Sequence, residues 1–132
     1  MARYVLHLGM KNTWCVLLVE DDVVLGPLTL ESLISIRQDG VLANSASSAY
    51  RQLSNKHRFE IMLLDLQLGA DRGEDIVHRL RREGIKVPRI VILSAQPEPE
   101  LKRAARSIEA QGYLQKPTTI NQIHQSMIAA MA

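Results

Sequence analysis

The sequence predicts a single α/β domain in which a five-stranded parallel sheet is covered by helices on both faces. Two observations predict it: short apolar runs alternate with segments of helical periodicity, and three of the runs are continuously apolar, as in strands buried on both faces. The length of 132 residues fits one such domain. Hydrophobic residues make up 46% of the chain and charged residues 23%, which argues against disorder.

Five segments are predicted as strands. Three are apolar runs that end in a polar residue, and two weaker candidates complete the sheet. The predicted strands span residues 15–19, 41–46, 60–65, 89–94 and 112–115. Because strands that alternate with helices are joined by right-handed crossovers, they are expected to lie parallel.

Five helices are predicted from apolar residues spaced three or four apart. The first begins near Gly26, since Pro27 fits only in the first turn of a helix, and it ends at Gly40. The second follows Ser47 as its N-cap. The apolar faces of the five helices consist of Leu30, Leu33 and Ile34; Ala49, Tyr50 and Leu53; Ile76, Val77 and Leu80; Leu101, Ala104, Ala105 and Ile108; and Ile120, Ile123, Met127 and Met131.

Charge, cysteine content and hydropathy argue against several classes of protein. Lys plus Arg number 16 and Asp plus Glu number 14, a balance that does not indicate a nucleic-acid or membrane binder. Cys15 is the only cysteine, which excludes an internal disulfide and a cysteine zinc site. No apolar run reaches the ~20 residues of a membrane span, and residues 1–10 lack a signal-peptide pattern. We therefore expect a cytoplasmic protein, with residues 1–12 as an N-terminal tail and residues 13–132 as the domain.

Polar side chains gather at the carboxyl ends of four predicted strands, where doubly wound sheets bind their ligands. They are Glu20, Asp21 and Asp22; Asp65; Ser94; and Lys116 with Pro117. If the first and third strands are neighbours, the carboxylates converge and repel one another unless a cation joins them. Carboxylate oxygens suit Mg²⁺, and a lysine with a hydroxyl suits an incoming phosphoryl group.

These residues resemble the receiver domain of two-component response regulators over residues 13–131. The matching motifs, each at the end of the expected element, are Val19-Glu20-Asp21-Asp22, Leu64-Asp65-Leu66, Gly73, Ser94-Ala95 and Tyr113-Leu114-Gln115-Lys116-Pro117. The resemblance implies a flavodoxin-like (βα)5 fold with strand order 2-1-3-4-5. It also implies a phosphoacceptor module of a phosphorelay, in which Mg²⁺-dependent phosphorylation of an aspartate switches a protein-interaction face.

The resemblance assigns roles to the acidic residues. Asp65 corresponds to the phosphoacceptor, a carboxylate nucleophile. Glu20 and Asp21 correspond to the acidic pair that holds Mg²⁺ with Asp65 and the backbone carbonyl of Gln67, Asp21 directly and Glu20 through water. Asp22 is instead predicted to cap the first helix.

The remaining roles belong to the last two strands and to one loop. Ser94 and Lys116 correspond to the hydroxyl and the ammonium group that bind the phosphoryl group, and Tyr113 corresponds to the aromatic switch that moves with Ser94. The bond between Lys116 and Pro117 is expected to be cis. Gly69 departs from the family, because receivers often carry proline at this position.

As a receiver, the chain is expected to take its phosphoryl group from a histidine kinase or a histidine phosphotransfer protein and to act on a downstream protein target. We expect no direct contact with nucleic acid or membrane, and no catalysis beyond self-phosphorylation and autodephosphorylation. One alternative is a degenerate receiver that acts as a phosphorylation-independent interaction domain, although Asp21, Asp65, Ser94 and Lys116 are all present. Another is an aspartate-nucleophile phosphohydrolase, which would need a second acid where the chain has Gln67.

Overall fold

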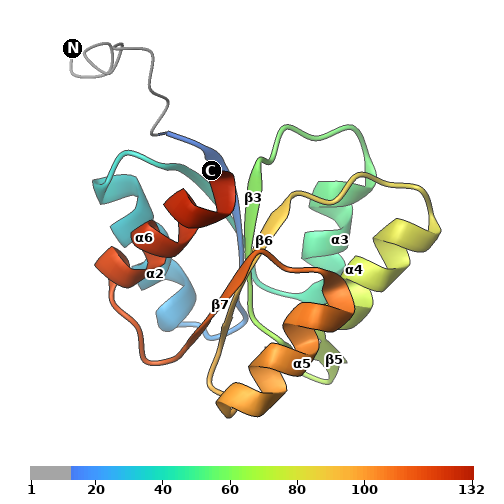
Figure 1. The fold of residues 1–132 in the computed structure, drawn as a ribbon. Coiled ribbons are helices and arrows are strands. Elements are labelled where there is room, and N and C mark those ends of the chain that lie inside the picture. The colour runs from blue at the N-terminus through green and yellow to red at the C-terminus, as the bar shows by residue number, and fades with distance from the viewer. Residues whose placement is uncertain (1–12) are drawn as a thin grey trace.

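A five-stranded parallel sheet forms the centre of the computed structural model, which describes residues 13–132 (Figure 1). Its strands, in spatial order, are β2 (Asp39–Ala43), β1 (Cys15–Val19), β3 (Ile61–Leu64), β6 (Arg89–Ser94) and β7 (Gly112–Gln115). Counted along the chain within this sheet, the order is 2-1-3-4-5, which confirms the predicted topology. Val19 pairs with Ala43 on one side and with Leu64 on the other, so the carboxyl ends of these three strands lie level.

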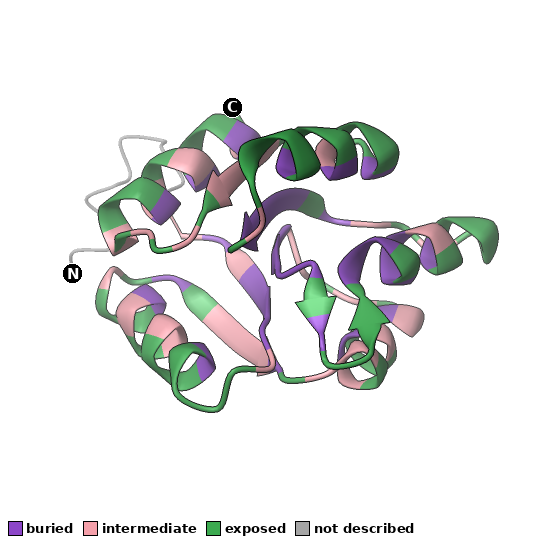
Figure 2. Ribbon diagram, turned by 90° about the horizontal axis from the view of Figure 1, so that it is seen from below, coloured by how far each residue is buried: buried purple, intermediate pink, exposed green. Residues whose placement is uncertain are grey.

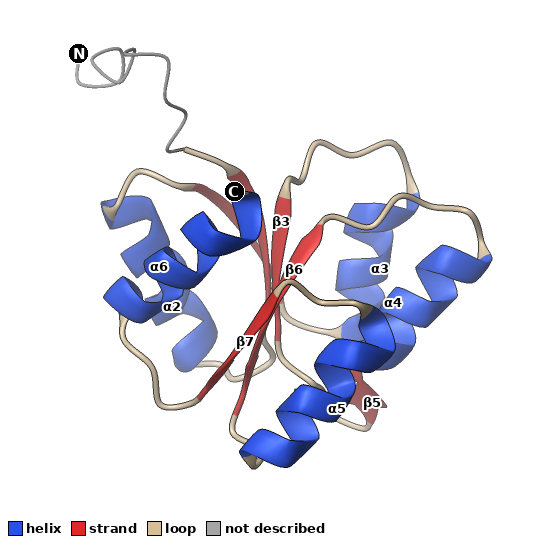
Figure 3. Ribbon diagram, in the orientation of Figure 1, coloured by secondary structure: helices blue, strands red, loops and turns tan. Residues whose placement is uncertain are grey.

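Helices cover both faces of the sheet (Figures 1 and 3). One face carries α2 (Leu25–Ser35) and α6 (Ile120–Met131), and the other carries α3 (Ala46–Ser54), α4 (Gly73–Arg82) and α5 (Glu98–Ile108). Figure 2 shows the central strands buried between helices whose outer sides are exposed. No helix among residues 13–132 is long and apolar enough to cross a membrane. The predicted tail, residues 1–12, lies outside the described residues.

Each face of the sheet has a core of its own. Leu17 and Met62 pack in the core beneath α3, α4 and α5, whereas Leu18 and Leu63 pack in the core beneath α2 and α6. Successive residues of a strand point to opposite faces, so a strand buried on both sides must be apolar throughout. This is why the central strands read as unbroken apolar runs.

The second strand begins two residues earlier than predicted. β2 spans Asp39–Ala43 rather than residues 41–46, and Gly40, predicted to end the first helix, lies within it. A Cβ atom at Gly40 would lie 2.9 Å from Leu30 Cδ1, so glycine here serves helix-to-strand packing. The chain leaves α2 through Arg37, whose φ of 66° supplies the left-handed turn that Gly40 was expected to supply.

The second predicted helix, α3, also begins earlier than predicted, because its N-cap is Ser45 and not Ser47. The Ser45 side chain accepts a 3.0 Å hydrogen bond from the Ser48 amide, three residues later. Three serines stand close together in this segment, so the sequence offers several candidate caps and the hydrophobic spacing does not choose among them. The first predicted helix, α2, begins where it was predicted to begin, with Pro27 in its first turn.

Candidate functional site

Three carboxylates meet at the carboxyl edge of the sheet. Glu20 and Asp21 follow β1, Asp65 follows β3, and one carboxylate oxygen of each lies within 4.8 Å of the others. Glu20 is 5% exposed and Asp65 is 7% exposed, so both charges are largely removed from water. The structure therefore brings together the three side chains predicted to hold a metal ion.

The ammonium group of Lys116 lies against two of these carboxylates. It donates a hydrogen bond to Glu20 Oε1 and another, of 3.2 Å, to Asp65 Oδ2. Burial lowers the pKa of Lys116, but its bond to Glu20 and the charges of Asp65 and Glu20 outweigh burial, so the pKa is raised and the ammonium stays protonated. Burial raises the pKa of Glu20 above its ordinary value, against the opposing effect of its hydrogen bond from Lys116. The peptide bond between Lys116 and Pro117 is cis.

A short hairpin that the sequence did not predict completes one wall of the site. Strands β4 (Gln67–Leu68) and β5 (Asp71–Arg72) pair antiparallel, and Gly69 turns between them with a φ of 64°. The Gly69 amide donates a 2.8 Å hydrogen bond to Asp21 Oδ2. Proline has no amide hydrogen, so the residue that departs from the family pattern supplies a donor that proline could not.

Local backbone contacts fix the position of Asp65. Its amide donates to the Val19 carbonyl at 3.1 Å, and its Oδ1 accepts a 3.2 Å hydrogen bond from the Gln67 amide. A Cβ atom on Gly73 would lie 2.4 Å from the Asp65 carbonyl oxygen, so only glycine allows α4 to start this close to Asp65. The role of the Gln67 carbonyl as a metal ligand stays a prediction.

Asp22 has a separate role from its two acidic neighbours. Its Oδ1 accepts hydrogen bonds from the amides of Val24 at 2.9 Å and Leu25 at 2.8 Å, at the start of α2. These bonds lower the pKa of Asp22. The position directly before α2 is Val24, which has no side-chain cap, so Asp22 accepts from the first amides of the helix from two residues further back than an N-cap.

Ser94 and Tyr113 lie at different depths on the neighbouring strands. Ser94 is fully buried at the end of β6, and its Oγ accepts a 3.3 Å hydrogen bond from the Gln96 amide. Tyr113 is half-buried in β7, and its hydroxyl donates a 3.1 Å hydrogen bond to Glu98 Oε2 in the first turn of α5. Burial and this bond raise the pKa of Tyr113. Within residues 13–132, no hydrogen bond joins either side chain to Asp65.

The donor set has a clear chemical preference. It offers carboxylate oxygens without cysteine or histidine, which fits a hard cation such as Mg²⁺ better than a soft one. Three carboxylates face one ammonium group, so the site keeps an excess of negative charge that a divalent cation would neutralise. Two features escaped the sequence-based prediction, namely the Gly69 amide, which no residue type signals, and Glu98, one of several exposed acids near α5.

Comparison with known proteins agrees with this geometry. The sequence model of the family described as the response regulator receiver domain matches residues 16–128. The chain is 30% identical over 107 residues to the regulatory protein VirG of Agrobacterium tumefaciens, covering 81% of this chain and 39% of VirG. It is 30% identical over 114 residues to the response regulator protein PmrA of Pseudomonas aeruginosa, covering 82% of this chain and 48% of PmrA. The chain thus spans less than half the length of either relative.

A solved structure shows the same fold. The chemotaxis protein CheY4 of Vibrio cholerae superposes with a TM-score of 0.79 at 21% sequence identity, over 89% of this chain and 98% of that chain. At this identity the likeness concerns the fold alone.

Proposed function

The chain belongs to the response regulator receiver domain family, and from this membership we propose that it is the phosphoacceptor module of a two-component phosphorelay, with Asp65 as the acceptor. Receiver domains are generally signalling modules without enzymatic turnover, and they interact with kinases or phosphotransfer proteins. One observation carries the proposal: the Asp65 carboxylate, 7% exposed, lies beside the Lys116 ammonium and within 4.8 Å of Glu20 and Asp21 oxygens.

Each residue of the site has a task in phosphoryl transfer. A carboxylate oxygen of Asp65 forms the new bond to phosphorus while the donor's P–N bond breaks, and the donor histidine nitrogen keeps the electron pair and takes up a proton. Lys116 holds a positive charge where the phosphoryl oxygens arrive. The Gln67 amide keeps the carboxylate of Asp65 oriented through Oδ1. The Lys116 amide donates a 2.8 Å hydrogen bond to the Ser94 carbonyl, so the two residues lie at the same level of the sheet. Ser94 supplies the hydroxyl group that binds the phosphoryl group.

The acidic residues serve the metal that this chemistry requires. Glu20, Asp21 and Asp65, with the Gln67 carbonyl, would hold Mg²⁺, which when bound offsets the negative charge shared between the carboxylates and the phosphoryl group. Tyr113 is proposed to move with Ser94 once the phosphoryl group is in place. Its bond to Glu98 then breaks, and the face formed by α5, β7 and α6 changes for a downstream protein target.

Acetyl phosphate labelling tests the proposal. The full chain, incubated with acetyl phosphate and Mg²⁺, should gain one phosphoryl group by intact-mass spectrometry, and Asp65→Asn should gain none. Asp39→Asn is the matched control, because Asp39 begins β2 at the opposite edge of the sheet, and it should label like the wild type.

Two outcomes contradict the proposal. Labelling of Asp65→Asn at the wild-type level would show that another residue accepts the phosphoryl group. A wild-type chain that takes no phosphoryl group from acetyl phosphate or from a phosphorylated histidine phosphotransfer protein would favour the degenerate receiver, which acts by contact alone.

A further inference from the structure

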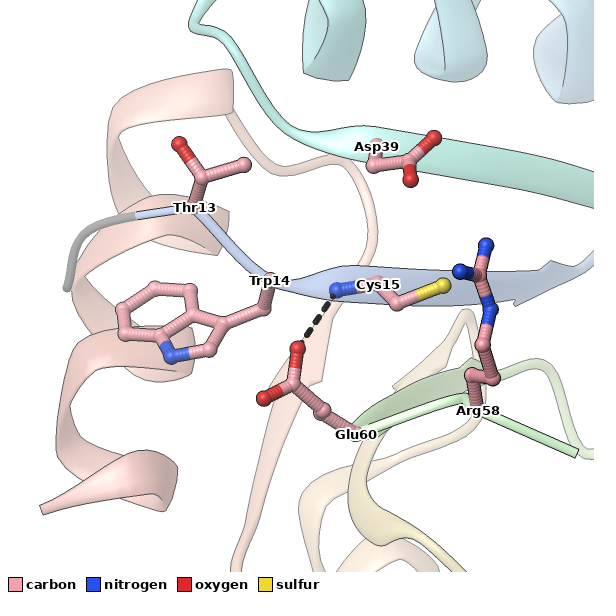
Figure 4. A pocket seen from close by; sticks show the side chains of 6 residues that line it. All are labelled: Thr13, Trp14, Cys15, Asp39, Arg58 and Glu60. Atoms are coloured by element: carbon pink, nitrogen blue, oxygen red, sulfur yellow. Dashed lines mark hydrogen bonds between the residues drawn. The ribbon is translucent and has the colours of Figure 1, made fainter. Parts of the chain in front are cut away.

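A groove runs along the amino edge of the sheet, at the opposite ends of the strands from Asp65. One hollow of about 470 Å³ lies between the segments that lead into β3 and β6, and a second of about 380 Å³ continues it to the end of α3. The two hollows share His57 and Lys86, so they form one surface, which we call the edge groove. A third hollow of about 410 Å³ joins it at Arg58 and Glu60 (Figure 4).

The edge groove is strongly positive. Four exposed cations line it: Lys56, Arg58, Lys86 and Arg89. None of them forms an ion pair with any of the described residues. Among the described residues of the lining, Glu60 is the one carboxylate. It accepts a 2.9 Å hydrogen bond from the Cys15 amide, and Figure 4 shows Arg58 reaching past Cys15 towards Asp39. Four cations against one carboxylate leave an excess of positive charge on a chain whose net charge is only +2.

Apolar side chains form part of the lining between the cations. Phe59 and Val87 line the larger hollow, and Ile85 lines the smaller one. All three are half-buried, and they pack against the core beneath α3, α4 and α5. A ligand that fills the groove would therefore meet apolar side chains on its floor and positive charges on its walls.

The walls of the groove are tied together by His57. Its Nδ1 accepts a 3.2 Å hydrogen bond from the Phe59 amide, so Nδ1 carries no proton and Nε2 must carry one. Nε2 then donates to the Lys86 carbonyl at 2.9 Å, which joins the two segments that form the groove. Arg89 is held in the same way, because it donates a 2.7 Å hydrogen bond to the Ala130 carbonyl at the end of α6. A groove with fixed walls loses little conformational freedom when a ligand binds.

We propose that the edge groove binds an acidic segment of a partner protein, in which carboxylates alternate with apolar side chains. Alternate side chains of an extended segment point in opposite directions, so one set can meet the cations while the other meets the floor. Nucleic acid fits less well, because a binder that neutralises many phosphates needs a longer row of cations, and a single strand also needs exposed aromatic rings on which successive bases stack, whereas Phe59 is half-buried. Residues 1–12 of this chain also fit less well, because they contain Arg3 and Lys11 but no Asp or Glu.

The proposal is tested with a fluorescein-labelled peptide of sequence Gly-Glu-Phe-Glu-Leu-Glu-Val-Glu-Gly, in which Glu strictly alternates with apolar residues, bound to the full chain and followed by fluorescence anisotropy. We expect binding at least tenfold tighter than for the peptide with Gln in place of Glu, and at least fivefold tighter than for the peptide with Ser in place of its three apolar residues. Added salt should weaken binding. Mg²⁺ with beryllofluoride should change the affinity by less than twofold, because the carboxylate site lies at the other edge.

Charge reversals locate the binding surface. Lys86→Glu combined with Arg58→Glu should weaken binding at least tenfold, and Lys56→Glu, whose side chain is exposed, gives a second variant with little risk to folding. The matched control is Lys102→Glu combined with Arg106→Glu on α5, which should bind within twofold of the wild type. Far-ultraviolet circular dichroism confirms that each variant is folded.

Any of four results overturns the proposal. They are no binding of the acidic peptide, equal binding of the Gln or Ser peptides, tighter binding of oligothymidylate in the same buffer, and equal loss of binding in the α5 control. The oligothymidylate result would assign the groove to nucleic acid, and equal binding of the Ser peptide would reduce the groove to a non-specific positive patch.

Discussion

The amide of Gly69 donates a hydrogen bond to Oδ2 of Asp21, across 48 residues of sequence. This bond ties the turn of the β4–β5 hairpin to the loop that follows β1. Asp21 is also the residue proposed to bind Mg²⁺ directly. A carboxylate has two oxygens that can each accept more than one bond, so the Gly69 amide can orient Asp21 without displacing a cation. The hairpin and the proposed metal site are therefore mechanically joined.

Magnesium should stabilise the folded chain through Asp21. A ligand that binds only the folded state, at ten times its dissociation constant, raises the free energy of unfolding by about 1.4 kcal/mol. Asp21→Asn should lose most of that increment, because it removes the charge but keeps an oxygen that can accept from Gly69. Thermal unfolding with and without Mg²⁺ measures the difference.

Asp22 provides the control for this experiment. Its Oδ1 accepts from the Val24 and Leu25 amides, so Asp22→Ala should cost about 1 kcal/mol of stability as a lost cap. It should nevertheless keep the whole Mg²⁺ increment. If Asp21→Asn kept the increment and Asp22→Ala lost it, the two adjacent aspartates would have to exchange roles.

The sheet and the carboxylate cluster could be predicted from the sequence because both depend on patterns of residue type. Strands buried on two faces must be apolar throughout, and parallel strands bring their carboxyl ends to one edge, where Glu20, Asp21 and Asp65 stand. The Gly69 hydrogen bond uses a backbone donor, which every residue except proline carries, so residue type does not reveal it. The end of α2 was misplaced because Arg37 adopts a left-handed conformation for which Gly40 was the better candidate by type.

Gly73 should not tolerate a side chain. A Cβ atom there would lie 2.4 Å from the Asp65 carbonyl oxygen and 3.1 Å from Leu64 Cγ, so Gly73→Ala must shift the start of α4 or the Asp65 backbone. Overpacking of this kind costs about 1–3 kcal/mol, and labelling by acetyl phosphate should slow because Asp65 moves.

Urea denaturation checks this prediction against a second glycine. At Gly26 the nearest atoms to a new Cβ lie 3.4 Å away, which is ordinary contact, and the residue lies in α2. Gly26→Ala should be neutral or should stabilise by up to about 1 kcal/mol. Equal effects of the two substitutions would mean that the contact at Gly73 relaxes without cost.

Glu83 should contribute stability that depends on pH. The Tyr50 hydroxyl donates to Glu83 Oε1 at 2.5 Å, and Arg79, which stacks on the Tyr50 ring, donates to Oε2 at 3.3 Å. These bonds, the one from Tyr50 first, lower the pKa of Glu83 below its ordinary value of 4.5. The unfolded chain therefore holds this proton more tightly, so the contribution is present above pH 4.5 and is lost as pH falls through the folded pKa.

A comparison of Glu83→Gln with the wild type isolates this contribution. Urea denaturation at neutral pH should find the variant less stable, and the deficit should shrink as the solution is acidified below pH 4.5. Asp75→Asn is the control. Asp75 is exposed in the first turn of α4, the helix that ends directly before Glu83, and it makes none of these contacts. A deficit that stays constant with pH would show that Glu83 acts by packing and not by its charge.

The hydrogen bond from Tyr113 to Glu98 should restrain the proposed switch. Inward movement of the tyrosine ring must break this 3.1 Å bond, so removing its acceptor should favour the form that binds a phosphoryl group. If the bond contributes about 0.5–1 kcal/mol, Glu98→Ala should tighten the binding of beryllofluoride about two- to fivefold. A titration followed by nuclear magnetic resonance measures the affinity.

Two further variants separate the restraint from a general effect of charge on α5. Glu100 lies in the same helical turn but pairs with Arg103 at 3.0 Å, so Glu100→Ala should leave the beryllofluoride affinity unchanged. Tyr113→Phe lacks the hydroxyl, so Glu98→Ala should have no added effect in that background. If Glu98→Ala tightened binding equally with Phe at this position, the cause would be the lost negative charge, and the hydrogen bond would not restrain the ring.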